Sequence, residues 1–132
     1  MLRNILAGVL GIAIAIAIVF LVTELNLVLY PLPEGLDTGD AAALRDHIAT
    51  LPLSAFLILM AGWSVATFVG AVVARRVGTA KAWIHPAVVG GFVFVATVTN
   101  MIAIPHPHWF MAVSLIAILG SAWLAWLVAQ TD

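Results

Sequence analysis

Apolar residues fill four long stretches of the chain, and polar residues and prolines gather in the three segments between them. Each stretch has about 20 residues or more, which at about 1.5 Å per residue is enough to cross a hydrocarbon core about 30 Å thick. The stretches are residues 5–29, 53–74, 83–104 and 108–129. The pattern predicts an all-α membrane protein, a four-helix bundle that forms one domain over residues 1–132.

The first stretch contains "IAIAIAI", whose alternation has the spacing of a strand. The alternating residues are Ala and Ile, which both suit lipid, and an isolated strand in lipid would leave its backbone groups unpaired. The apolar run is also too long for a signal peptide, and no small-x-small cleavage site precedes "YPLPEG". We therefore expect an uncleaved transmembrane helix.

The segment between the first two spans predicts a short helix over residues 40–51. The prolines of "YPLPEGLD" end the first helix. Asp40 can then cap a new helix, the alanines that follow favour it, and Pro52 marks its end. We expect this helix to lie on the outer membrane surface or over the mouth of the bundle.

One face of this outer helix is apolar. Leu44, Ile48 and Leu51 fall at positions i, i+4 and i+7, and Arg45 points elsewhere. The face either rests on the protein's own bundle or docks a partner, so these four residues are candidate partner contacts.

Small residues recur at helical spacing in the first two spans. Gly8, Gly11 and Ala15 lie on one side of the first, and Ala66, Gly70 and Ala74 repeat every four residues in the second. Such spacing lets helix backbones approach closely. It predicts tight packing within the bundle or a contact between two copies of the chain.

Composition agrees with a membrane protein and excludes several functions. The chain is 64% hydrophobic and 8% charged, whereas soluble domains are about 45–50% apolar and about 25% charged. A net charge of −1 with five Lys and Arg provides no basic surface for nucleic acid. The chain has no cysteine, which excludes thiol chemistry and disulfides. We expect its partners to be the lipid bilayer and other membrane proteins or a second copy.

The basic residues predict the orientation. Those near the first span and between the second and third are Arg3, Arg75, Arg76 and Lys81. In the outer segment 30–52, Arg45 is the one Lys or Arg residue, and the other charged residues there are acidic. Because Lys and Arg gather on the cytoplasmic side, we expect both termini in the cytoplasm, and the protein in a bacterial inner membrane.

Glu24 is the one acidic residue within the predicted spans. An ionisable residue inside a membrane suggests function by default. Glu24 lies five residues before Leu29, roughly 7–8 Å below the outer end of its span. Counting inward on the other spans predicts an intramembrane polar layer of Glu24, Asn26, Thr97, Asn100 and Ser114.

Three hypotheses compete for this layer. It could be a hydrogen-bonded clamp between helices, in which amide and hydroxyl groups donate to the carboxylate. Glu24 could instead face a cation on another protein or a lipid head group. The third hypothesis is a proton or cation site of a transporter.

Four short helices with one acidic residue in the first resemble the small multidrug resistance transporters, which work as dimers. That resemblance implies a proton-coupled transporter that acts as a homodimer, with Glu24 as the coupling carboxylate. The chain departs from that family in two ways, because its carboxylate lies near the outer end of the span and a long loop follows.

A second resemblance covers nearly the whole chain. The elements "MLRNILAGVLG", "LYPLPEGLD", "IATLPLSAF", "VVARR" and "NMIAIPHPHWF" are similar to those of a family of small four-helix bacterial inner-membrane proteins without a characterised function. The resemblance implies a shared fold and no known reaction.

Histidines near the outer end of the predicted bundle suggest a metal site, because imidazole is a common transition-metal ligand. His106 and His108 flank Pro107, and His47 could approach from the outer helix. Two neighbouring histidines make an incomplete site, so we expect no bound metal and no cofactor.

No catalytic motif is present, since the chain lacks G-x-S-x-G, H-E-x-x-H and P-loop patterns. We therefore expect no catalytic residues and no enzymatic activity. The leading hypothesis is an accessory or assembly subunit of a larger membrane complex, such as a respiratory or photosynthetic one.

Overall fold

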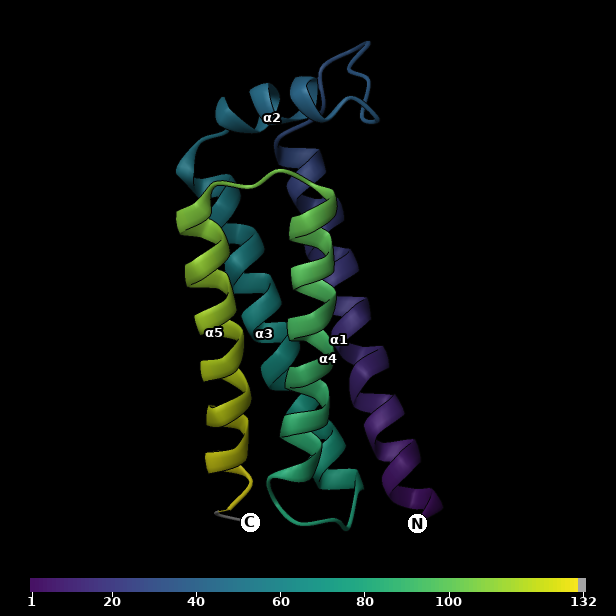
Figure 1. Ribbon diagram of the computed structural model, residues 1–132. Helices are drawn as coiled ribbons and strands as arrows, with labels where there is room; N and C mark the ends of the chain where they lie inside the picture. Colours follow the sequence, from purple (N-terminus) through teal and green to yellow (C-terminus); the bar gives the residue numbers. More distant parts are fainter. Residues whose placement is uncertain (131–132) are drawn as a thin grey trace.

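The computed structural model describes residues 1–130, and these residues are helical or irregular, without strands. The helices are α1 (Leu2–Leu29), α2 (Ala41–Ala49), α3 (Leu53–Val77), α4 (Ile84–Ala103) and α5 (His108–Val128). All except α2 are long and apolar enough to cross a membrane, and they form a bundle (Figure 1). The predicted all-α fold, with a short helix between the first two spans, is confirmed.

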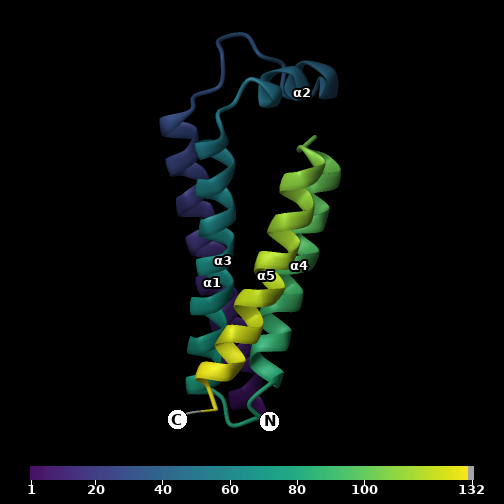
Figure 2. The ribbon, with the colours of Figure 1, turned by 90° about the vertical axis from the view of Figure 1, so that its left-hand side faces the viewer.

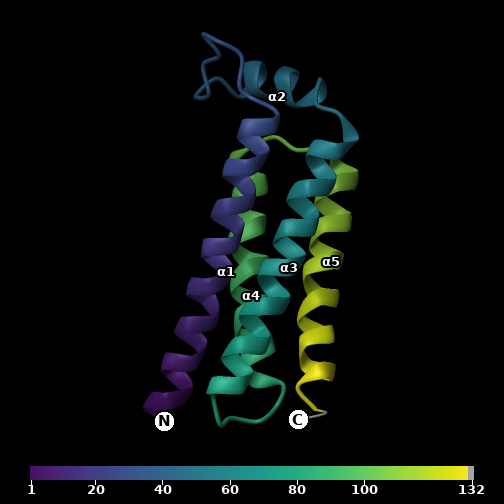
Figure 3. The same cartoon turned by 180° about the vertical axis from the view of Figure 1, so that it is seen from behind.

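The two ends of the bundle differ. Helix α2 lies across one end, which we call the α2 end, and both termini and the link between α3 and α4 lie at the other, the terminal end (Figures 1 and 3). Helix boundaries agree with the sequence patterns to within three residues. The largest differences are at the terminal end, where α1 begins at Leu2 and α3 continues to Val77.

These extensions are held together by one hydrogen bond. The Arg3 Nε atom donates to the carbonyl oxygen of Val77 at 2.7 Å, which joins the first turn of α1 to the last turn of α3. Arg75 and Arg76 lie in that last turn, where positive charge is favourable beside the carbonyl end of a helix.

Helices α1 and α3 pack closely because glycines meet. A Cβ atom at Gly11 would overlap the carbonyl oxygen of Gly70, and a Cβ atom at Gly70 would overlap that of Gly11. The predicted close packing of small residues within the bundle is confirmed. Gly91 of α4, in contrast, faces open space.

The four spans are not packed equally. Helix α1 lies mainly against α3 and more lightly against α4, and α3 also packs against both α4 and α5, which contact each other. The contacts of α1 with α4 include Gly8 beside Val88 and Gly11 beside Val89, near the terminal end. Toward the α2 end, α4 and α5 lean away from α1 and α3 (Figure 2). Helices α1 and α4 are therefore closest near the terminal end and further apart toward the α2 end, whereas α1 and α5 lie furthest apart at the terminal end (Figures 1 and 3).

Helix α2 covers the end at which α1 and α4 are further apart. The Asp40 carboxylate accepts hydrogen bonds from two backbone N–H groups of the first turn of α2. Asp40 therefore caps this helix, as the sequence predicts. Ile48 is buried, and Leu44 and Leu51 pack against the core, whereas Arg45 is exposed. In the isolated chain, the apolar face of α2 therefore rests on the protein's own bundle.

Candidate functional site

Glu24 lies on the outside of the bundle. Its side chain is exposed, and it makes no hydrogen bond or ion pair within residues 1–130. Asn26, two residues further along, points toward α3. Two residues correspond to about 200° around a helix axis, so Glu24 points nearly the opposite way.

The polar layer expected around Glu24 divides into separate environments. Asn26 is buried, and its Nδ2 atom donates to the carbonyl oxygen of Ala55 at 2.9 Å. Ser114 on α5 is only 1% exposed, and its hydroxyl has no hydrogen-bond partner within residues 1–130. Thr97 and Asn100 lie together on α4 and line a groove. No amide or hydroxyl in the described chain donates to the Glu24 carboxylate, so the clamp expected around it is not formed.

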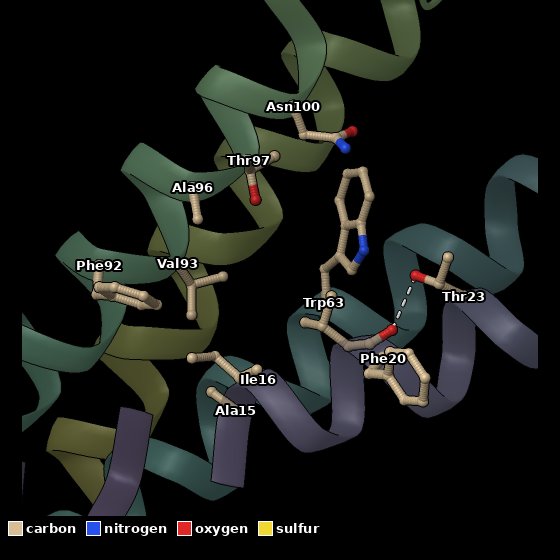
Figure 4. A pocket seen from close by; sticks show the side chains of 11 residues that line it. Ala15, Ile16, Phe20, Thr23, Trp63, Phe92, Val93, Ala96, Thr97 and Asn100 are labelled. Atoms are coloured by element: carbon tan, nitrogen blue, oxygen red, sulfur yellow. Dashed lines mark hydrogen bonds between the residues drawn. The ribbon is translucent and has the colours of Figure 1, made fainter. Parts of the chain in front are cut away.

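This groove, which we call the α1–α4 groove, has a volume of about 320 Å³. Its walls come from α1 and α4, and Trp63 of α3 extends between them (Figure 4). The lining residues are Ala15, Ile16, Val19, Phe20, Thr23, Trp63, Phe92, Val93, Ala96, Thr97 and Asn100. The lining extends over nine residues of each of α1 and α4, from 15 to 23 and from 92 to 100, a rise of about 12 Å.

Two polar groups on mostly buried side chains that line the groove have no partner in the described residues. Trp63 and Thr97 are each 6% exposed, and neither the indole N–H nor the hydroxyl makes a hydrogen bond there. Most membrane Ser and Thr residues bond their own helix. Those that donate to the carbonyl four residues earlier are Thr23, Ser64, Thr67, Thr99 and Ser121. Thr97 differs because its hydroxyl points into the groove (Figure 4).

Sequence reasoning missed Trp63. The signal was visible, because Trp63 lies in the interior of a span, away from the interfaces where tryptophan usually anchors a helix. Its N–H group can only donate, and buried indoles usually find an acceptor.

A line of exposed residues follows the outer side of α1. Its members are spaced three or four residues apart, so they share one helix face. They are Leu6, Leu10, Ala13, Ala17, Leu21, Glu24 and Val28. We call this face the α1 stripe, and Glu24 is its one polar member.

The histidines at the α2 end lie beneath α2. His106 and His108 line two cavities of about 400 and 330 Å³, and Arg45 lines both with them. His47 is not among the lining residues. Within residues 1–130, no group of three His, Asp or Glu residues could hold a metal ion.

His106 has a defined environment. Its Nδ1 atom lies 2.7 Å from the carbonyl oxygen of Ile104, and because a carbonyl only accepts, the proton is on Nδ1. The ring stacks on Phe110 with centroids 5.4 Å apart. Burial lowers the pKa of His106 below 6.5, and the bond to Ile104 opposes this in part.

A polar cluster that sequence reasoning also missed fastens the terminal end. The Asn4 Oδ1 atom accepts from the backbone N–H groups of Thr79 at 2.7 Å and Ala80 at 3.0 Å, and from the Thr79 hydroxyl. His85, only 2% exposed, has its Nε2 atom 3.4 Å from the Asn4 carbonyl oxygen. Asn4 thus joins α1 to the link between α3 and α4.

Together these features define a multi-pass membrane protein with a lateral groove and an acidic group on its outer surface. Comparison with protein-family models, curated proteins and solved structures finds no match to this chain.

Proposed function

We propose that this chain is a non-enzymatic subunit that binds another membrane protein through the α1 stripe. The partner helix carries a Lys or Arg at the depth of Glu24. The observation that supports this proposal is the position of Glu24, exposed on the outside of α1 and unpaired within residues 1–130.

The depth of Glu24 makes an unpaired carboxylate unfavourable. Val22 packs against Gly62 and Asn26 bonds to Ala55, which places Glu24 about 8 Å below the start of α3. A carboxylate facing lipid at the centre of a helix costs about 2.5–3.5 kcal/mol on insertion scales, and less near the ends. A cation on a neighbouring helix removes this cost.

The rest of the stripe suits a helix as the partner. Ala13 and Ala17 lie four residues apart near the middle of α1 and are exposed. Small residues at this spacing let a second helix approach closely, and van der Waals packing drives association in lipid. The larger side chains of Leu6, Leu10 and Val28 extend the contact to both ends.

The distribution of basic residues supports an orientation. The terminal end carries Arg3, Arg75, Arg76 and Lys81, which favours a cytoplasmic location for this end in a bacterial inner membrane. Helix α2 would then lie on the outer side. Glu24 would meet its partner in the outer leaflet.

A photo-crosslinking amino acid at Ala17 tests the proposal, with the same amino acid at Leu119 as the control. Leu119 is 54% exposed on α5 and lies outside the α1 stripe. We expect Ala17, and not Leu119, to form an adduct with one membrane protein that also co-purifies in fixed stoichiometry after mild extraction.

Charge reversal identifies the contact. Glu24→Lys should abolish the adduct, and reversing the partner cation nearest the crosslink should restore it. An adduct that persists in Glu24→Lys would overturn the proposal. So would the absence of any adduct from Ala17 in the otherwise native chain in its source membrane. An adduct with a second copy of the chain would also overturn it and indicate a homodimer.

A further inference from the structure

We infer that the α1–α4 groove binds one acyl chain of a glycerolipid, whose ester carbonyl accepts a hydrogen bond from Thr97. This site is independent of the partner proposed for the α1 stripe, because it uses another face of α1.

The unpartnered groups determine which atom the ligand must supply. The indole N–H of Trp63 can only donate, and the Thr97 hydroxyl can also donate. Both side chains are 6% exposed and neither group has a partner within residues 1–130, which is costly where no water is present. An acceptor oxygen entering the groove beside Thr97 pairs with its hydroxyl, whereas the indole nitrogen of Trp63 lies on the Thr23 side of the ring (Figure 4). The exposed Asn100 amide provides a further donor at the same end.

The rest of the groove requires an apolar and uncharged ligand. Beyond Thr23, Trp63, Thr97 and Asn100, the lining consists of aliphatic, alanine and phenylalanine side chains, and none of the lining residues is charged. Phe20 and Phe92 are 61% and 41% exposed and border the groove. A hydrocarbon chain fits such a lining, whereas a charged head group does not.

The direction of the groove matches a lipid in the bilayer. Its polar end, at Asn100, is three residues from the last residue of α4, or about 5 Å from the end of the span. Its apolar end, at Ala15 and Phe92, lies closer to the middle of the bundle. A glycerolipid has the same order, with ester groups near the membrane surface and chains pointing to the centre.

The volume is too small to enclose a transmembrane helix. A helix about 10 Å across and 12 Å long fills about 900 Å³, whereas the groove holds about 320 Å³. A single hydrocarbon chain is thin enough to enter between α1 and α4.

Two synthetic lipids with the same chains and head group test the carbonyl contact. One is a diester phosphatidylcholine and the other is its diether analogue, which has no carbonyl. Binding to the purified full chain in detergent micelles is measured by native mass spectrometry. We expect the diester to bind about threefold to tenfold more tightly, as one or two membrane hydrogen bonds would give.

Substitutions locate the binding. Thr97→Val keeps the side-chain shape and should reduce the preference for the ester. Ala96→Trp should fill the groove and abolish binding, whereas Ala87→Trp, at an exposed position of α4 outside the groove, should not. A phosphatidylcholine with a diazirine in one acyl chain should label peptides that contain Phe20 or Phe92.

Several results would overturn the inference. These are equal binding of the diester and diether, an unchanged preference in Thr97→Val, or labelling that Ala96→Trp leaves intact. A prenyl quinone that displaces the diester at lower concentration would also overturn it. If Ala96→Trp fails to fold by circular dichroism, the isosteric Thr97→Val variant alone provides the decisive comparison.

Discussion

The Asn26 amide donates to the carbonyl oxygen of Ala55 at 2.9 Å and so joins α1 to α3 near the α2 end. This bond crosses between helices in a buried position. Glu24 is only two residues away and faces outward. The two polar residues of one helix turn therefore have different roles, one within the fold and one on its surface.

Asn26→Leu should destabilise the isolated protein. The expected loss is about 0.6–1.7 kcal/mol, because one hydrogen bond between membrane helices disappears. Glu24→Leu should leave the stability of the isolated chain unchanged or raise it, since no bond is lost. SDS titration of the detergent-solubilised protein, followed by circular dichroism, measures both. A larger loss for Glu24→Leu would show that the carboxylate stabilises the bundle from within.

Gly70→Val should disrupt the pairing of α1 and α3. A side chain at Gly70 would meet the carbonyl oxygen of Gly11, and overpacking of this kind costs about 1–3 kcal/mol. Gly91→Val is the matched control, because a Cβ atom at Gly91 meets no neighbour within 4 Å. Both variants can be compared in the same SDS titration. Equal stability of the two variants would contradict close contact between Gly11 and Gly70.

Asn4→Ala should loosen the link between α3 and α4. The variant loses three hydrogen bonds to Thr79 and Ala80 and should lose about 1–3 kcal/mol of stability. Trypsin cleavage after Lys81 should become faster, because the link opens more often. The control is Gln130→Ala at an exposed position, and cleavage at the same rate in both variants would contradict the role of Asn4.

Acidification should destabilise the α2 end through His106. Burial lowers the pKa of the folded state below 6.5, so the unfolded state binds the proton more readily. The contribution of neutral His106 is therefore present above about pH 6.5 and is lost as the pH falls through the folded pKa. The free energy of unfolding at pH 8 and pH 5.5 should differ less in His106→Gln than in the native chain. A pH difference in His106→Gln that equals that of the native chain would contradict this role of His106.

The fold could be predicted because lipid imposes length and composition on each span. A run of about 20 apolar residues between charged or proline-containing segments leaves few alternatives to a membrane helix. The ends were less certain. The first turn of α1 could not be predicted as helix, because Arg3 and Asn4 are stabilised by residues more than seventy positions away.

The candidate site was predicted less well, because depth can be counted along a helix whereas rotation about its axis cannot. Thr97 and Asn100 share a face because they are three residues apart, and they do line one groove. The sequence leaves open whether Glu24 points inward with them or outward to a partner. Its actual direction depends on which side of α1 meets α3, and the glycine contact that decides this involves two helices.

The two ends of the bundle are held together by different kinds of contact. At the terminal end, the backbones of α1 and α3 meet at Gly11 and Gly70, and Asn4 bonds to the link that follows α3. At the α2 end, where α4 and α5 lean away from the other pair (Figure 2), aromatic side chains bridge the space, and the ring centroids of Phe56 on α3 and Phe110 on α5 are 5.3 Å apart. Substitutions that add side-chain atoms should therefore be least tolerated at the terminal end, and substitutions that remove them at the α2 end.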